Sequence, residues 1–155
     1  MASAVAIRDL SDWKEHSRRA GLSQAITEDR ARAKHRTLDP KRILIVEDNI
    51  DSARSLAILL HEMGHRPEYA INGYAGLAAV KTFKPHVVLL DLGLPGMSGF
   101  EFCAHLRRFE EGKAARVMVV TAYNTPEDRA RSQALGCEVH LIKPVPPEVL
   151  EELLR

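Results

Sequence analysis

Several features that would restrict the class of this protein are scarce or absent in its 155 residues. The only two cysteines, Cys103 and Cys137, have no metal-ligand spacing and form no disulfide framework, which favours a reducing cytoplasm. No apolar run approaches the ~20 residues that a membrane-spanning helix needs. Residues 1–7 lack the charged start and apolar stretch of a secretory signal. A net charge of +1 gives no general reason to bind nucleic acid. We therefore expect a cytoplasmic protein without nucleic-acid or membrane partners.

The chain divides by composition at about residue 41. Residues 1–41 carry an excess of basic residues and few large apolar ones, since alanine supplies many of their apolar positions. Helix signals run from Ser11 to Gly21 and over residues 23–35, and Pro40 closes the segment. We interpret residues 1–41 as a partly helical or flexible extension. Two interpretations remain open for it, a loosely held tail and an arm that docks on a partner or on a second copy in a homodimer.

Residues 42–155 predict one α/β domain, because short apolar runs alternate with amphipathic stretches. The predicted strands are listed here in chain order: residues 43–46, 66–70, 87–90, 117–120 and 139–142. The predicted helices between and after them cover residues 53–63, 74–83, 100–109, 126–135 and 147–154. Such alternation requires crossover connections and hence a doubly wound parallel sheet. Because the first, third and fourth strands are the most apolar, the order 2-1-3-4-5 of a flavodoxin-like fold places them centrally.

Polar side chains follow the apolar runs at one end of this predicted sheet. Glu47 and Asp48 follow the first strand, Asp91 the third, Thr121 the fourth and Lys143 the fifth. Each residue alone is explained by a helix cap, a turn or a solvated strand end. Together, the acids would repel one another and require a counter-ion. A hard divalent cation with oxygen ligands, such as Mg²⁺, meets that requirement.

The same residues indicate phosphoryl transfer. Asp91, on the middle strand, is the predicted nucleophile that would become an aspartyl-phosphate. Asp48 is the predicted direct metal ligand, with Glu47 assisting directly or through water. Lys143 and Thr121 can hold phosphoryl oxygens.

This segment resembles the receiver domain of two-component response regulators. The matching stretches are ILIVEDN at residues 43–49, VLLDLGLPGMSG at 88–99, VTA at 120–122 and KP at 143–144. The resemblance implies that Asp91 accepts phosphate from a sensor histidine kinase or phosphotransfer protein. It further implies that Asp48, Asp91 and the backbone carbonyl of Gly93 bind Mg²⁺. Thr121 and Lys143 would contact the phosphoryl group and carry the switch, and a cis peptide would precede Pro144.

One position departs from the family pattern. The residue three before the lysine is commonly Tyr or Phe and turns inward when the switch threonine moves, whereas here it is His140. Either His140 is an ordinary histidine of a strand, or it replaces the aromatic switch residue and adds pH sensitivity. The last helix is also expected to be short.

The sequence leaves three functions to compare. The first is a stand-alone response regulator that relays phosphate or changes its binding to an unknown downstream protein. Such a protein is not an enzyme, since it catalyses only its own phosphorylation and dephosphorylation. The second is a receiver-like adaptor that works without phosphorylation. The third, an aspartyl-phosphate phosphatase, needs an acid two residues after the nucleophile, and that position is Gly93.

Overall fold

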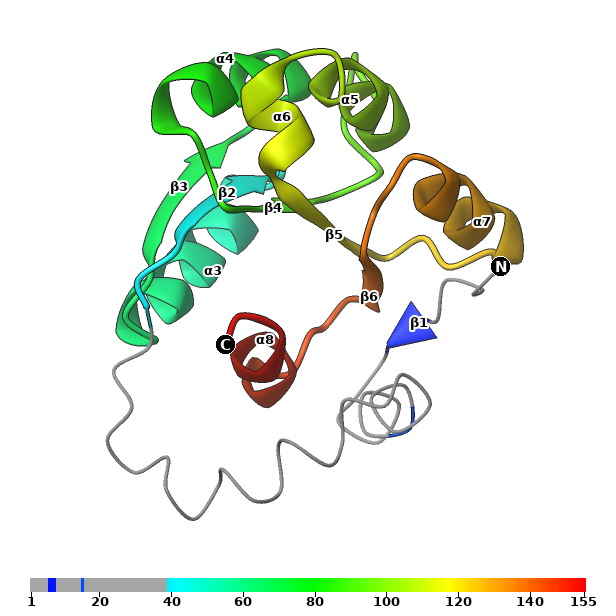
Figure 1. Cartoon of the computed structure of the whole chain (residues 1–155). Coiled ribbons are helices and arrows are strands. Elements are labelled where there is room, and N and C mark those ends of the chain that lie inside the picture. Colours follow the sequence, from blue (N-terminus) through cyan, green and yellow to red (C-terminus); the bar gives the residue numbers. More distant parts are fainter. Residues whose placement is uncertain (1–5, 8–14, 16–38) are drawn as a thin grey trace.

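The computed structural model describes residues 6–7, 15 and 39–155 (Figure 1). Within these residues, a parallel sheet of six strands has the order β1-β6-β5-β4-β2-β3. The strands are β1 (Ala6–Ile7), β2 (Arg42–Val46), β3 (Arg66–Ala70), β4 (Val87–Leu90), β5 (Arg116–Thr121) and β6 (Val139–Ile142). The helices are α3 (Ile50–Glu62), α4 (Gly73–Phe83), α5 (Gly99–Leu106), α6 (Glu110–Ala114), α7 (Pro126–Ala134) and α8 (Pro147–Leu153).

Helices cover both faces of this sheet. In Figure 1, α4, α5, α6 and α7 lie on one side of the strands, and α3 and α8 lie on the other. Successive residues of β2 point to opposite sides, so that Leu44 and Val46 join one apolar cluster while Ile43 and Ile45 join the second. Burial on both faces is why the central strands are continuous apolar runs. The predicted doubly wound fold, with the order 2-1-3-4-5 for β2 to β6, is confirmed.

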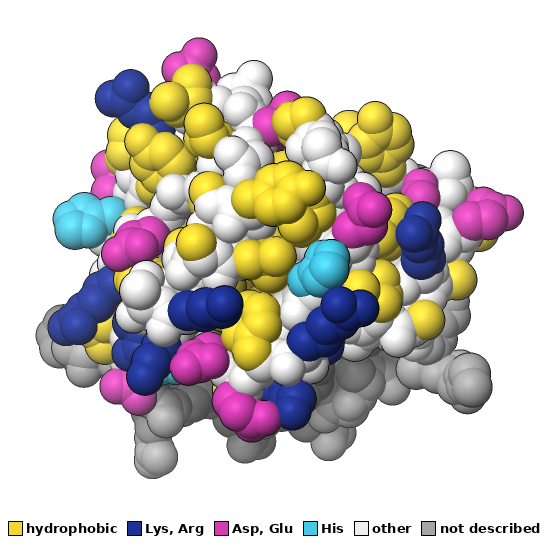
Figure 2. All heavy atoms as spheres, turned by 90° about the horizontal axis from the view of Figure 1, so that it is seen from above, with side chains coloured by type: hydrophobic (Ala, Val, Ile, Leu, Met, Phe, Trp, Pro, Cys, Tyr) yellow, Lys and Arg dark blue, Asp and Glu magenta, His cyan; other side chains and the backbone are white. Residues whose placement is uncertain are grey.

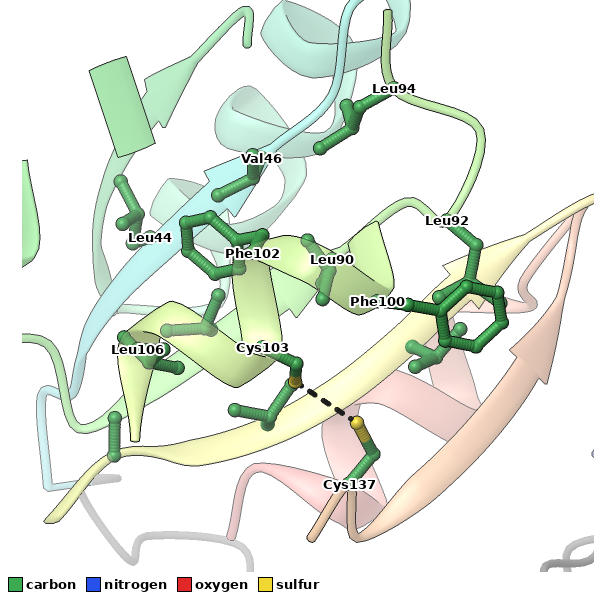
Figure 3. Close-up of a cluster of buried hydrophobic side chains, with 14 of the residues drawn as sticks. Leu44, Val46, Leu90, Leu92, Leu94, Phe100, Phe102, Cys103, Leu106 and Cys137 are labelled. Carbon is green, nitrogen blue, oxygen red and sulfur yellow. Dashed lines mark hydrogen bonds between the residues drawn. The ribbon is translucent and has the colours of Figure 1, made fainter. Parts of the chain in front are cut away.

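The cluster beneath α5 is the larger of the two. Figure 3 shows Phe102 and Leu106 of α5 beside Leu44 and Leu90 of the sheet. Phe102 and Leu106 are both fully buried. Full burial of such side chains contributes about 1.5–3 kcal/mol each, which holds α5 firmly on the sheet.

Side-chain caps set the start of several helices. Asn49 and Asn72 accept backbone hydrogen bonds at the starts of α3 and α4. Ser98 opens α5 with a capping box: its hydroxyl accepts from the Glu101 backbone, and the Glu101 carboxylate accepts from the Ser98 N–H. Thr125 and Asp128 form a second box on α7. These caps fix where each helix begins relative to the strand end that precedes it.

Two features differ from the sequence prediction. The stretch predicted as one helix over residues 100–109 ends at Leu106, and a separate helix α6 begins at Glu110. The segment interpreted as helical or flexible contributes a sixth strand, β1, whose Ala6 and Ile7 pair with His140 and Leu141 at the edge of the sheet. A strand of two residues is too short to produce an alternating pattern. Of the helix predicted from Ser11, the structure describes Glu15 alone, as helical, and the helix signal over residues 23–35 lies outside the described residues.

The surface above α4, α5 and α6 carries acidic and basic side chains side by side, with hydrophobic groups between them (Figure 2). No charge of one sign dominates that face. Within the described part of the chain, no helix combines the length and apolar character that crossing a bilayer requires.

Candidate functional site: an acidic cluster at the carboxyl edge of the sheet

The site residues come from four parallel strands that end at the same edge. Val46 pairs with Leu90, and Leu90 in turn pairs with Val119, so the residues that follow β2 and β4 lie beside each other. Glu47 and Asp91 are the first residues after those two strands. Thr121 is the last residue of β5, and Lys143 follows β6 directly. The register thus brings together the residues that the sequence placed at strand ends.

Asp91 is held by three donors. The Thr121 hydroxyl donates to its Oδ1 at 3.0 Å. The backbone N–H of Gly93 donates to the same oxygen at 3.0 Å. The Lys143 ammonium donates to Oδ2 at 2.8 Å and also pairs with the Glu47 carboxylate. This set orients the Asp91 carboxylate and leaves it partly open to solvent, at 12% side-chain exposure.

The charge balance keeps Asp91 ionised. Burial raises the pKa of Asp91, but the bonds from Lys143, Gly93 and Thr121 outweigh burial, and the net pKa lies below the ordinary value of 3.8. Burial lowers the pKa of Lys143, whereas its bonds to Asp91 and Glu47 raise it, and the net pKa is raised. At neutral pH the site therefore offers an anionic carboxylate oxygen beside a fixed ammonium.

The acidic residues fit a divalent cation. Oxygen atoms of Glu47, Asp48 and Asp91 all lie within 4.8 Å of one another. Glu47 is buried and Asp48 is exposed, so the cluster is accessible from solvent on the Asp48 side. Lys143 is the cation that pairs with this cluster among the described residues, and it bonds Glu47 and Asp91. A cluster that carries more negative than positive charge, and whose donors are hard oxygens, suits Mg²⁺.

The surroundings of the site are also shaped by Pro144 and by a cavity. The Lys143–Pro144 peptide is cis, the conformation that the family resemblance implies. A cavity of about 530 Å³ is lined by α3 and by residues of the α8 region, and it reaches Glu47, Asp91 and Lys143. Its walls include Leu56, Leu59 and Leu150.

A chain of hydrogen bonds continues from Asp91 toward α7. The Thr121 hydroxyl, which donates to Asp91, also accepts from the Tyr123 N–H at 3.2 Å. The Tyr123 carbonyl lies 2.8 Å from Nε2 of His140, and Nδ1 of His140 lies 3.3 Å from the Ser132 hydroxyl in α7. His140 is fully buried. Since a carbonyl only accepts, Nε2 carries a proton.

Tyr123 and Ser132 were not singled out by the sequence. Tyr123 takes part through its backbone, which no side-chain motif reveals. Ser132 lies on the helix that contacts His140, and only the packing of α7 against β6 brings it within reach. No signal in the sequence alone could have identified either residue.

A strand-end aspartate, held by a lysine and a threonine beside a cluster of acids, lies at the switch point of this doubly wound sheet, where such folds bind their ligands. The sequence model of the response regulator receiver domain family matches residues 43–155. The chain belongs to this family of two-component signalling proteins. Members of the family are signalling proteins and not classical enzymes.

Some curated relatives match the chain over most of their own length, and others over only about half of it. Protein PilH of Pseudomonas aeruginosa is 36% identical over 109 residues, covering 70% of this chain and 90% of PilH. The polar-differentiation response regulator DivK of Brucella anthropi is 31% identical, covering 68% of this chain and 86% of DivK. The transcriptional regulatory protein AfsQ1 of Streptomyces coelicolor is 31% identical, but the match spans only 49% of its length.

Solved structures agree with the fold. The chemotaxis protein CheY4 of Vibrio cholerae has a TM-score of 0.71 at 29% identity, covering 74% of this chain and 96% of CheY4. A response regulator from Burkholderia pseudomallei, solved with a phosphorylated aspartic acid and a calcium ion, has a TM-score of 0.68 at 27% identity. That match covers 74% of this chain and 66% of the other.

Proposed function

We propose that this chain is a cytoplasmic response regulator receiver that accepts a phosphoryl group on Asp91 from a sensor histidine kinase or phosphotransfer protein. An Asp91 oxygen attacks phosphorus, the bond from phosphorus to the donor atom breaks, and that atom leaves with the bonding electrons. The observation that carries this proposal is the Asp91 carboxylate, bonded to Lys143 and Thr121 within the acidic cluster.

The remaining site residues have supporting roles in this proposal. Asp48, Asp91 and the Gly93 carbonyl would hold Mg²⁺, with Glu47 assisting directly or through water. When bound, Mg²⁺ neutralises charge on the phosphoryl oxygens. Lys143 and Thr121 exchange their bonds to Asp91 for bonds to the phosphoryl oxygens. The bonds that Thr121 and Lys143 now make to Asp91 are therefore the contacts that phosphorylation changes.

The switch reaches α7 through His140. If Thr121 moves toward a phosphoryl group, the Tyr123 N–H that it accepts from is drawn with it, and the Tyr123 carbonyl pulls on His140. His140 then acts as a hydrogen-bonded coupling residue between the Tyr123 backbone and Ser132. The output is a changed surface near α7 that an unknown downstream protein binds, or onward relay of the phosphate.

The experiment compares wild type with Asp91→Asn by intact mass after incubation with acetyl phosphate and Mg²⁺. We expect one labile phosphoryl group of about 80 Da on the wild type alone. Equal gain in both proteins would mean that the nucleophile is wrong. Absence of gain in folded wild type would favour the phosphorylation-independent adaptor. A phosphatase would instead turn over an aryl phosphate continuously, and the glycine at position 93 argues against it.

The coupling is tested separately with His140→Leu, which removes the hydrogen bonds without supplying the aromatic ring common in the family, and with Ser132→Ala. Both variants should gain phosphate as wild type does, since neither side chain contacts Asp91. The change in amide hydrogen exchange of α7 on phosphorylation should be smaller in both. An unchanged α7 response in both variants would refute the role of His140.

A further inference from the structure

Two buried thiols lie in contact on the side of α5 that faces away from the solvent. Cys103 is on α5, and Cys137 is in the turn between α7 and β6, 34 residues later. Their Sγ atoms are 3.3 Å apart, and Figure 3 shows the two side chains pointing at each other. Cys103 is 1% exposed and Cys137 is 8% exposed, and both are free thiols. The sequence predicted no disulfide because the spacing of two cysteines says nothing about their distance in space.

A fixed positive charge lies beside this pair. Arg107, directly after α5, donates to the carbonyls of Ala115 and Gly136 at 2.8 and 2.9 Å. Gly136 immediately precedes Cys137, so the guanidinium is held against the turn that carries the second thiol. A neighbouring cation favours thiolate, the form that reacts with oxidants.

The two thiols also differ from each other. The hydrogen bond from Cys137 lowers the pKa of Cys103 despite its burial, and the charge of Arg107 adds to this. The hydrogen bond to Cys103 and burial raise the pKa of Cys137. The contact therefore places a thiol whose pKa is lowered against one whose pKa is raised and that can supply a proton.

We propose that Cys103 and Cys137 are a dithiol site that a peroxide converts into a reversible intramolecular disulfide. The Cys103 thiolate attacks one peroxide oxygen, the O–O bond breaks, and hydroxide leaves, which gives a sulfenic acid on Cys103. The Cys137 sulfur then attacks the Cys103 sulfur, the S–O bond breaks, and water forms with the Cys137 proton. Overall, two thiols are oxidised, and hydrogen peroxide is reduced to two waters. The sulfur atoms need to approach by only about 1.3 Å to reach bonding distance.

This bond would join two parts of the molecule that now touch without a covalent link. α5 follows the loop that begins at Asp91, and the Cys137 N–H donates to the carbonyl of Ser132 at the end of α7. The disulfide would therefore tie α7 to α5. If α7 responds to phosphorylation as proposed above, the oxidised protein should respond less.

The test oxidises the full chain with hydrogen peroxide and records its intact mass. We expect a loss of about 2 Da without dimer formation, a linked pair of peptides containing Cys103 and Cys137, and full reversal by dithiothreitol. Oxidised protein should also unfold at a temperature about 5–10 °C higher, because the bond closes a long loop in the unfolded chain.

Single-cysteine variants provide the controls. Folding of Cys103→Ala and of Cys137→Ala is checked by circular dichroism. On oxidation, neither variant should lose 2 Da or become more stable. Asp91→Asn should form the disulfide as wild type does, so the outcome does not depend on phosphorylation. Thiols that stay unreacted, that only add oxygen, or that link two chains would each overturn the proposal.

Discussion

Replacing Gly99 with alanine tests how closely the loop between Asp91 and α5 is packed. Gly99 is the first residue of α5, and its N–H donates to the Leu92 carbonyl at 3.1 Å. A Cβ at this position would lie 2.5 Å from the Asp91 carbonyl oxygen and 2.7 Å from the Leu92 Cα. Both atoms belong to the backbone, so no side chain can turn away to make room.

The geometry sets the size of the effect. Carbon atoms pack at about 3.5–4.0 Å, so the contact to the Leu92 Cα is about 1 Å too short. Overpacking of this kind costs about 1–3 kcal/mol. Alanine is also a better helix former than glycine by up to about 1 kcal/mol. A net loss of stability would therefore show that the steric clash outweighs this gain. Moving Asp91 by a fraction of an ångström disturbs its 2.8 Å bond to Lys143.

Gly93→Ala is the matched control. Its Cβ would meet the Tyr123 ring at 2.6 Å, but that ring is 57% exposed and can swing away. We expect Gly99→Ala to lose about 1–2 kcal/mol in urea unfolding and to accept phosphate from acetyl phosphate at least about tenfold more slowly. Gly93→Ala should change stability by less than about 0.5 kcal/mol. Equal effects of the two substitutions, or wild-type behaviour of Gly99→Ala, would refute the steric reasoning.

Three further predictions concern a helix cap, the buried histidines and the metal. Ser98→Ala removes the hydroxyl that caps α5 and should cost about 1 kcal/mol in urea unfolding, with Ser98→Thr largely retaining the cap; equal losses would exclude capping as the cause. Burial lowers the pKa of His65 and of His140 below 6.5, so each imidazole is neutral in the folded protein. Their contribution to stability is full above pH 6.5 and falls as the pH drops below it, because the unfolded chain takes up protons first. His140→Phe should flatten the fall in urea midpoint between pH 7 and pH 5, and an unchanged slope would count against this assignment. Saturating Mg²⁺ at about 100 times its dissociation constant should stabilise wild type by about 2.7 kcal/mol, whereas Asp48→Ala should need far more Mg²⁺ for the same thermal shift; identical Mg²⁺ titrations would remove Asp48 from the site.

Local pattern accounts for most of the fold. The strands β2, β4 and β5 are buried on both faces, which makes them continuous apolar runs that can be recognised without a structure. Their alternation with helices limits the topology to few arrangements. The division of α5 from α6 was missed because it depends on packing. A Cβ on Gly112 would lie 1.9 Å from the Leu106 carbonyl oxygen, and that close approach is visible only after the chain has turned.

The residues of the candidate site could be predicted from the sequence because of the same geometry that brings them together. Parallel strands end at one edge, so polar residues that follow apolar runs must meet there, and Asp91, Thr121 and Lys143 do so. Their bonds set the pKa of Asp91, which requires distances and could not be inferred from order along the chain. The ion pair between Glu47 and Lys143 likewise could not be predicted from the sequence.

By itself, the sequence determined the five strands from β2 to β6, their order and the edge at which the charged residues collect. The strands could be recognised because hydrophobic periodicity is a local property of the chain. Tertiary structure alone decided which side chains from distant segments lie within bonding distance. Cys103 meets Cys137 across 34 residues, and His140 meets Ser132 through the packing of α7 on the sheet. The pairing of β1 with β6 likewise depends on the free backbone groups of an edge strand. A strand of two residues is too short for its sequence to predict that pairing.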